Sequence, residues 1–225
     1  KRNFVIANLI LILVFFSLSG INYLLPFYLK YVRSYDTSTA GLIMTALSFA
    51  MMVAGLIAGV SYNRVGARRL CILASLPLVL GYLLMTMLRT YTPTGFVIIA
   101  LALIGFGLGL IVSPITTMIM MSVSKSKAGM LSSLTSLERT GPMCIGIATY
   151  NALLILGIIL IAKRHEITME APATIKMEVL SVGFDIAFML SLILGIVILV
   201  LSIAVKEEVH PDYAAEEKVL VRNRE

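Results

Sequence analysis

The stretch Gly95–Ser122 reads GFVIIALALIGFGLGLIVSPITTMIMMS and contains no charged residue. A helix needs roughly 20 predominantly apolar residues to cross the hydrocarbon core of a bilayer, and this run is longer than that. Within the core, backbone polar groups must bond one another, so only helices and closed barrels are stable there. The stretch therefore predicts a transmembrane α-helix.

Further apolar segments of spanning length lie on both sides of this one. Of the 225 residues, 59% are hydrophobic and 13% are charged, which leaves too little polar surface to coat a water-soluble globule. The sequence therefore predicts an all-α membrane protein, in which residues 1–206 form a six-helix transmembrane domain and residues 207–225 form a charged cytoplasmic tail. The predicted spans cover about residues 3–29, 37–62, 68–88, 95–122, 129–162 and 179–205.

The basic residues indicate how the helices are oriented. The formal net charge is +6, but the lysines and arginines lie in the short gaps between apolar runs, so they point to topology and not to nucleic acid. Six spans place both termini on one side. Residues 1–2, 64–69 and 125–127 make that side the more basic one, so the positive-inside rule predicts cytoplasmic termini. We expect a protein of the cell (plasma) membrane, with lipid as its surroundings.

The sequence contains no recognisable catalytic or metal-binding motif. Cys71 and Cys144 lie in apolar runs, and there is no HExxH motif and no Ser/His/Asp set, so we expect no metal, cofactor or enzymatic activity. The glycine-rich GFGLGL lies in mid-span without a preceding strand or a following Lys-Ser/Thr, which argues against nucleotide binding. We expect Gly105 and Gly109 to allow close helix packing instead.

The most specific local signal is GVSYNRVGARR, residues 59–69. Gly66 permits a tight turn, and the arginines can bond helix ends, a carboxylate or lipid phosphate. Gly55 and Gly59 can bring their helix close to a neighbour in GxxxG fashion. The simpler interpretation is an ordinary positive-inside loop.

This loop resembles the signature of the major facilitator superfamily: a Gly, three residues, an Asp, an Arg, a variable residue, a Gly and two basic residues. Asn63 replaces the usual Asp, and Ala67 is inserted before the basic end. The resemblance implies a gating loop, formed by Gly59, Asn63, Arg64, Gly66, Arg68 and Arg69.

A second stretch, Gly105–Ala148, is similar to the fourth and fifth helices of the carboxyl-terminal half in the fourteen-spanner drug:proton antiporter branch. Pro26 and Pro114 stand near the far ends of the first and fourth helices, which fits an inverted 3+3 repeat, although prolines are also common in membrane helices in general. The resemblance implies half of a major facilitator fold. Its first, second, fourth and fifth helices would line a central cavity against a missing amino-terminal half of six or eight helices, in the same polypeptide or an associated chain.

Polar and adaptable side chains recur on shared faces of three predicted helices, as cavity-lining helices require. Such residues also join helices inside any membrane bundle, so each has a structural alternative. The candidate cavity residues are Asn8, Ser19, Asn22 and Tyr23 on the first helix, Ser113, Thr116, Thr117 and Met120 on the fourth, and Ser136, Arg139 and Asn151 on the fifth.

Glu138, Arg139 and Asp185 place charges inside apolar spans, where charge is costly and usually functional. Two roles are open for Glu138. It can carry the coupling proton, or it can form a structural ion pair with Arg64 or Arg68, and we favour the pair.

Asp185 has the same two roles open, and we expect it to cap or to pair with Lys163 or Lys176. Taken together, these features predict the carboxyl-terminal half of a secondary active transporter, which exports small amphipathic, drug-like compounds against a proton gradient by alternating access. The alternatives are a superfamily transporter of another small solute, a six-helix half-transporter acting as a homodimer, and a non-transporting membrane anchor or interaction module.

Overall fold

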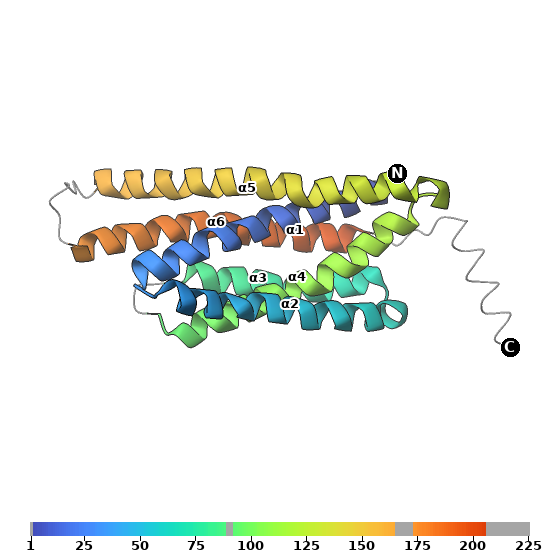
Figure 1. Ribbon diagram of the computed structural model, residues 1–225. Coiled ribbons are helices and arrows are strands. Elements are labelled where there is room, and N and C mark those ends of the chain that lie inside the picture. Colours follow the sequence, from blue (N-terminus) through green and yellow to red (C-terminus); the bar gives the residue numbers. More distant parts are fainter. Residues whose placement is uncertain (1, 89–91, 165–172, 206–225) are drawn as a thin grey trace.

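The computed structural model describes residues 2–88, 92–164 and 173–205, and all the regular secondary structure within these ranges is helical (Figure 1). Six helices are long and apolar enough to cross a membrane, which confirms the predicted six-helix, all-α architecture. They are α1 (Arg2–Phe27), α2 (Thr37–Val65), α3 (Ala67–Thr86), α4 (Thr94–Met121), α5 (Ala128–Arg164) and α6 (Ala173–Ala204). A π-helical turn, Tyr28–Val32, extends α1, and a 3-10 turn, Lys125–Lys127, precedes α5.

Successive helices run in alternating directions. The start of α1, the α2–α3 turn, the α4–α5 connection and the end of α6 all lie at the same end of the bundle, on the right of Figure 1. We call this the inner end and the opposite one the outer end. The inner end is the one that the basic residues predict to face the cytoplasm.

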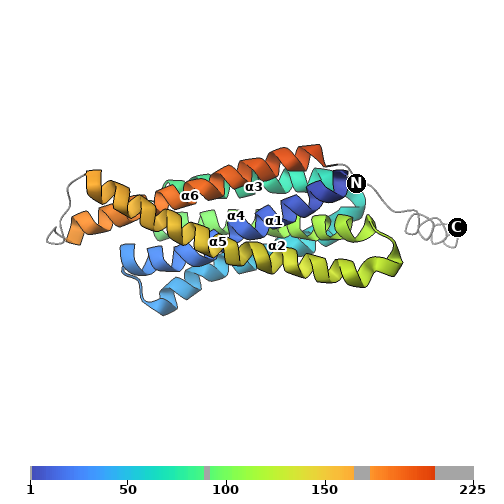
Figure 2. The same ribbon diagram turned by 90° about the horizontal axis from the view of Figure 1, so that it is seen from above.

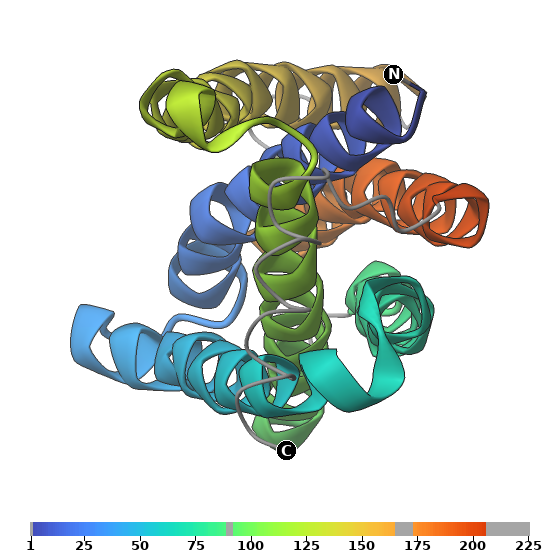
Figure 3. The ribbon, with the colours of Figure 1, turned by 90° about the vertical axis from the view of Figure 1, so that its right-hand side faces the viewer.

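The helices pack in two related sets of three, one formed by α2, α3 and α4 and the other by α1, α5 and α6. Helix α2 packs on α4 as α5 packs on α1, and α3 packs on α4 as α6 packs on α1. Exchanging α1 with α4, α2 with α5 and α3 with α6 therefore returns the same pairs, as an inverted 3+3 repeat requires. Figure 3 shows α1 and α4 in the middle, with α3 and α6 together on one side, and Figure 2 shows α5 crossing α1.

Glycines set how closely α2 and α4 approach. A Cβ added at Gly105 would collide with the backbone carbonyl of Leu47, and one at Gly109 with that of Met51, so the predicted close packing through these two glycines is confirmed. A Cβ at Gly55 or Gly59 would meet nothing within 4 Å. The backbone N of Gly55 would lie 3.0 Å from a Cβ added at Gly109, so α2 and α4 do approach closely there, while the packing of a neighbour on the open sides of Gly55 and Gly59 stays a prediction.

Buried tyrosines join the helices across the interior. The Tyr82 hydroxyl on α3 donates a hydrogen bond to Ser17 Oγ on α1 at 2.8 Å, and the Tyr150 and Ser191 hydroxyls of α5 and α6 share one at 2.7 Å. A buried hydroxyl without a partner is costly, so each pair favours one arrangement of its helices.

The outer end of α2 carries a side-chain cap. Asp36 Oδ2 accepts hydrogen bonds from the backbone N–H groups of Ser38 at 3.1 Å and Thr39 at 3.3 Å. Such caps satisfy amide groups that have no partner within the helix.

Candidate functional site

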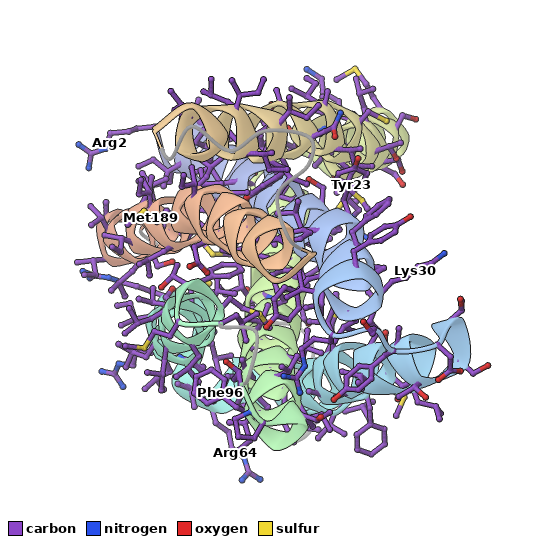
Figure 4. The ribbon with its side chains drawn as sticks, turned by 90° about the vertical axis from the view of Figure 1, so that its left-hand side faces the viewer. Arg2, Tyr23, Lys30, Arg64, Phe96 and Met189 are labelled. Atoms are coloured by element: carbon purple, nitrogen blue, oxygen red, sulfur yellow. The ribbon has the colours of Figure 1, made fainter. Side chains whose placement is uncertain are left out.

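On one side of the bundle, the two least buried helices lie next to the two most buried ones. Only 22% of the spanning window of α2 and 17% of that of α5 are buried, against 61% for α1 and 56% for α4. Helices α1 and α4 are thus central, and α2 and α5 flank them. We call the side formed by these four helices, away from α3 and α6, the open face (Figures 3 and 4).

Arg139 lies where three helices of the open face meet. Its Nη2 donates a hydrogen bond to Thr116 Oγ1 on α4 at 3.2 Å, and its guanidinium carbon lies 5.6 Å from the centre of the Phe15 ring on α1. A cation over an aromatic face is attracted by the ring quadrupole. The structure thus brings together two residues that the sequence predicted on separate helices, and adds Phe15, which the sequence analysis missed.

A second polar contact lies further toward the outer end. The Tyr23 hydroxyl donates a hydrogen bond to Asn151 Oδ1 on α5 at 2.9 Å, and Asn22 beside it is exposed. Figure 4 shows Tyr23 on the side of the bundle opposite α3 and α6. Tyr23 and Asn151 are therefore a second pair of candidate residues that the fold brings into contact.

Asn8 and Ser19 are buried among the helices. Asn8 is 8% exposed and donates to the Phe4 carbonyl at 2.6 Å, while fully buried Ser19 donates to the Phe16 carbonyl at 2.6 Å. Their contacts in this structure are with their own helix and its neighbours.

The remaining candidates on α4 and α5 are more accessible. Thr117 Oγ1 donates to the Ser113 carbonyl at 3.1 Å, and exposed Ser136 bonds a carbonyl of its own helix. Ser113, Thr117 and Met120 are half-buried. The hydroxyls of Thr117 and Ser136 thus satisfy the helix backbone first, as is common for Ser and Thr in helices.

The predicted ion pair of Glu138 with Arg64 or Arg68 is absent from the structure. Glu138 is half-buried, and its Oε2 is enclosed without a hydrogen-bond partner among the described residues. The reason is the packing: α5 lies against α1 and α6, whereas Arg64 and Arg68 flank the α2–α3 turn on the opposite side of the bundle (Figure 1). Glu138 does not bond Arg139 either, since adjacent helical residues point in different directions.

The candidate gating loop is almost entirely helical. Gly66 alone separates α2 from α3, with φ 82°. This backbone conformation favours glycine because it lacks a Cβ. Arg68 Nη2 donates to the Ile203 carbonyl at the end of α6 at 2.9 Å, and Arg64 and Arg69 are exposed. The first basic residue after the turn therefore caps another helix instead of pairing with a carboxylate.

Two predictions of this group fall on undescribed side chains. Asn63 belongs to α2, but its side chain is outside the described part of the structure, as are the side chains of Lys163 and Lys176. Asp185 is half-buried in the outer half of α6. The pairing of Asp185 with either lysine therefore stays a prediction.

Comparison of the sequence with models of protein families identifies the family of this chain. The sequence model of the Major Facilitator Superfamily matches residues 1–147. The chain belongs to this superfamily. Its members are membrane transporters, so the membership places the chain among transport proteins and not among enzymes.

The chain is also similar in sequence to three bacterial proteins. The chain is 34% identical to the multidrug resistance protein Stp of Mycobacterium tuberculosis over 141 residues, which cover 63% of this chain and 26% of that protein. It is 27% identical over 152 residues to the riboflavin transporter RibZ of Clostridioides difficile, covering 68% and 33%. It is also 27% identical over 154 residues to the multidrug transporter protein MdtP of Bacillus subtilis, covering 68% and 28%. The matched segment thus spans a third or less of each relative.

A solved structure shares the superfamily fold. A bacterial homologue of the human drug peptide transporters PepT1 and PepT2 superposes with a TM-score of 0.71 at 20% identity. The superposition covers 94% of this chain and 43% of that one. At this identity the likeness concerns the fold alone, and the fold is that of the superfamily.

A row of aromatic rings that the sequence analysis missed runs from the end of α1 into its π-helical extension. The ring centres of Tyr23 and Phe27 lie 5.1 Å apart, those of Phe27 and Tyr31 lie 6.0 Å apart, and Lys30 Nζ lies 5.6 Å from the centre of the Tyr31 ring. Phe27 and Tyr31 are 39% and 51% exposed. Their one-turn spacing is visible in the sequence and could have indicated the row.

Proposed function

We propose that the chain is the carboxyl-terminal half of a secondary active transporter that exports small amphipathic, drug-like compounds by alternating access. The observation that carries this proposal is the meeting of α1, α4 and α5 at Arg139, through Phe15 and Thr116. In a transporter of this superfamily, a polar contact between a flanking helix and the central helices of the open face is suited to bind a solute near mid-membrane. The names of two relatives, a multidrug resistance protein and a multidrug transporter protein, support the drug-like class.

The open face is the surface on which we place the amino-terminal half, of six or eight helices, in the same polypeptide or an associated chain. Support comes from α2, where a Cβ at Gly55 or Gly59 would meet nothing within 4 Å and Leu56 is 68% exposed. Small residues spaced in this way allow close packing of a further helix. The half-buried and exposed candidate cavity residues then lie between the two halves, in the plasma membrane, with the inner end in the cytoplasm.

Glu138 is our candidate for proton coupling. Its enclosed Oε2 has no hydrogen-bond partner among the described residues, and the basic residues of the α2–α3 turn are out of its reach. An isolated carboxylate in a membrane interior is costly, so binding a proton relieves that cost and releasing it requires a change of surroundings. Alternating access supplies such a change.

The test uses the full-length protein in proteoliposomes with an imposed pH gradient and a fluorescent efflux dye. We expect uphill dye movement that collapses when the gradient is dissipated. Glu138→Gln should leave downhill dye movement and abolish the uphill component. Asp36→Asn, at the exposed cap of α2, is the matched control and should keep both. Dye movement that ignores the pH gradient in the unmodified protein contradicts proton coupling, and the absence of any dye movement contradicts the drug-like class.

The aromatic row favours a second candidate, transport of a planar aromatic solute. Exposed Phe27 and Tyr31 offer stacking surfaces at the end of α1 and in its π-helical extension, and one relative is named a riboflavin transporter. Competition decides between the candidates: riboflavin that blocks dye efflux and is itself accumulated favours the planar solute, whereas riboflavin without effect excludes it.

A further inference from the structure

Arg139 carries a positive charge that the described part of the chain does not balance. Its single hydrogen bond goes to the neutral hydroxyl of Thr116, and its Nε is enclosed without a partner. The adjacent Glu138 does not contact it, and no other described carboxylate does. A guanidinium within a membrane span normally has an anionic or carbonyl partner, because isolated charge is costly there.

The neighbours of Arg139 orient its guanidinium without neutralising it. The Phe15 ring lies against the group, 5.6 Å from the guanidinium carbon, and Thr116 accepts from Nη2. Phe15 is 8% exposed, so the ring is held by the packing of α1. Both supports belong to this domain, and the position of the guanidinium therefore does not depend on a second domain. Arg139 itself is half-buried, so part of it reaches the surface.

We propose that Arg139 binds an anionic group of the transported solute, a carboxylate or a group of similar geometry, on an otherwise apolar body. The inference rests on the proposed transport function and narrows its substrate class from amphipathic compounds in general to amphipathic anions. A guanidinium offers parallel N–H donors that match the two oxygens of a carboxylate. The half-buried Met120, on the same helix as Thr116, supplies an adaptable apolar surface for the remainder of the solute.

The binding test compares two dyes that differ in a single charge. Diethylaminocoumarin carboxylic acid and its methyl ester are titrated with the solubilised full-length protein, and binding is followed by fluorescence anisotropy. We expect the acid to bind more tightly than the ester. Arg139→Gln should weaken the acid about ten- to a hundred-fold, as expected for a lost charge-assisted hydrogen bond, and should change the ester less than about two-fold.

Two further variants keep the test decisive. Arg139→Lys keeps the charge but lacks the planar fork, so it should weaken the acid alone, by less than Arg139→Gln does. Lys127→Gln removes one exposed positive charge in the α4–α5 connection and should leave both dyes unchanged. Thermal unfolding of each variant shows whether it is folded. If Arg139→Gln does not fold, the effect of Arg139→Lys on binding of the acid tests the anion site.

The outcomes separate this inference from the proposed function. Equal weakening of acid and ester, or no weakening of either, overturns the anion site. Equal weakening is the result expected if Arg139 is instead paired with a carboxylate of the other half. Gradient-driven flux in proteoliposomes is measured separately. If the acid is preferred in an Arg139-dependent way but no flux is seen, the anion site stands and the transport function is contradicted. If only the ester is transported, the anion site is contradicted and the transport function stands.

Discussion

Arg139 Nη2 on α5 donates a hydrogen bond to Thr116 Oγ1 on α4 at 3.2 Å. Helices α4 and α5 follow each other in the chain but make little direct contact, because α4 packs mainly on α2 and α3 and α5 mainly on α1 and α6. The bond therefore crosses between the two sets of three helices. Thr116 in turn donates to the Val112 carbonyl at 2.7 Å, which fixes its lone pairs toward the arginine.

Thr116→Val should impair transport without unfolding the protein. Valine keeps the shape of threonine and removes the acceptor, so the guanidinium loses its only described hydrogen bond. The loss of one such bond is worth about 0.5–1.5 kcal/mol, or roughly two- to ten-fold in dye transport. Thr149→Val is the control, since the Thr149 hydroxyl bonds only the Ile145 carbonyl of its own helix, at 2.9 Å. Equal effects of the two substitutions would contradict a role for the bond to Arg139.

Tyr23→Phe and Asn151→Ala should be coupled in their effects on transport. The two side chains share one hydrogen bond of 2.9 Å, so the second substitution removes nothing once the first is made. In a double-mutant cycle we expect the combined loss to be smaller than the sum of the single losses by about 0.5–1.5 kcal/mol. Initial rates of dye efflux supply the four values, and strict additivity would show that the bond does not form in the working transporter.

Gly109→Ala should destabilise the bundle. The new Cβ would meet the Met51 carbonyl and the Ala54 Cβ, so α2 and α4 must move apart at a cost of about 1–3 kcal/mol. Gly41→Ala is the matched control within α2, where a Cβ meets nothing within 4 Å and alanine favours the helix. Thermal unfolding of the detergent-solubilised protein should show a lower midpoint for the first variant only. A midpoint for Gly109→Ala equal to that of the unmodified protein would rule out tight packing at this crossing.

The cap of α2 should respond to acid. The hydrogen bonds from the side chain and backbone of Thr39 hold the pKa of Asp36 below its usual range. A carboxyl group with a depressed pKa in the folded state contributes stability at a pH above its unfolded value, and that contribution is lost as the pH falls through the folded value. Asp36→Ala should therefore lower the unfolding midpoint at neutral pH, and the difference should shrink in strong acid. Asp36→Asn, which keeps an acceptor, should show a difference that varies less with pH; a constant difference for Asp36→Ala would argue against the charged cap.

The fold could be predicted from the sequence because a bilayer leaves a helix few alternatives. An uncharged run such as Gly95–Ser122 has one stable arrangement in hydrocarbon. The close packing at Gly105 and Gly109 could also be predicted, since glycines within a membrane helix usually mark a crossing. A Cβ added at Gly55 or Gly59, which have the same spacing, would meet nothing within 4 Å, and spacing alone does not identify the partner.

The contacts of the site were harder to predict, because a helical wheel gives directions but no neighbours. Ser19 and Tyr23 share a predicted face and both lie against α5, but Ser19 is fully buried beside Gly146 whereas half-buried Tyr23 reaches Asn151, and the wheel does not give this difference in burial. The partner of Arg68 is a backbone carbonyl at the end of α6, which charge matching between side chains does not suggest. The charge of Glu138 predicts an ion pair with the basic loop, whereas the packing places the two on opposite sides of the bundle.

A final consequence follows from Gly66. As the only residue between α2 and α3 outside a helix, it makes one pair of backbone angles the pivot through which α2 can swing relative to α3. Arg68, two positions later at the start of α3, donates a hydrogen bond to the Ile203 carbonyl at the end of α6. A swing of α2 about Gly66 would therefore leave α3 packed on α6, and Gly66→Ala, which strains this pair of backbone angles, should lower the rate of dye transport even where every solute contact is intact.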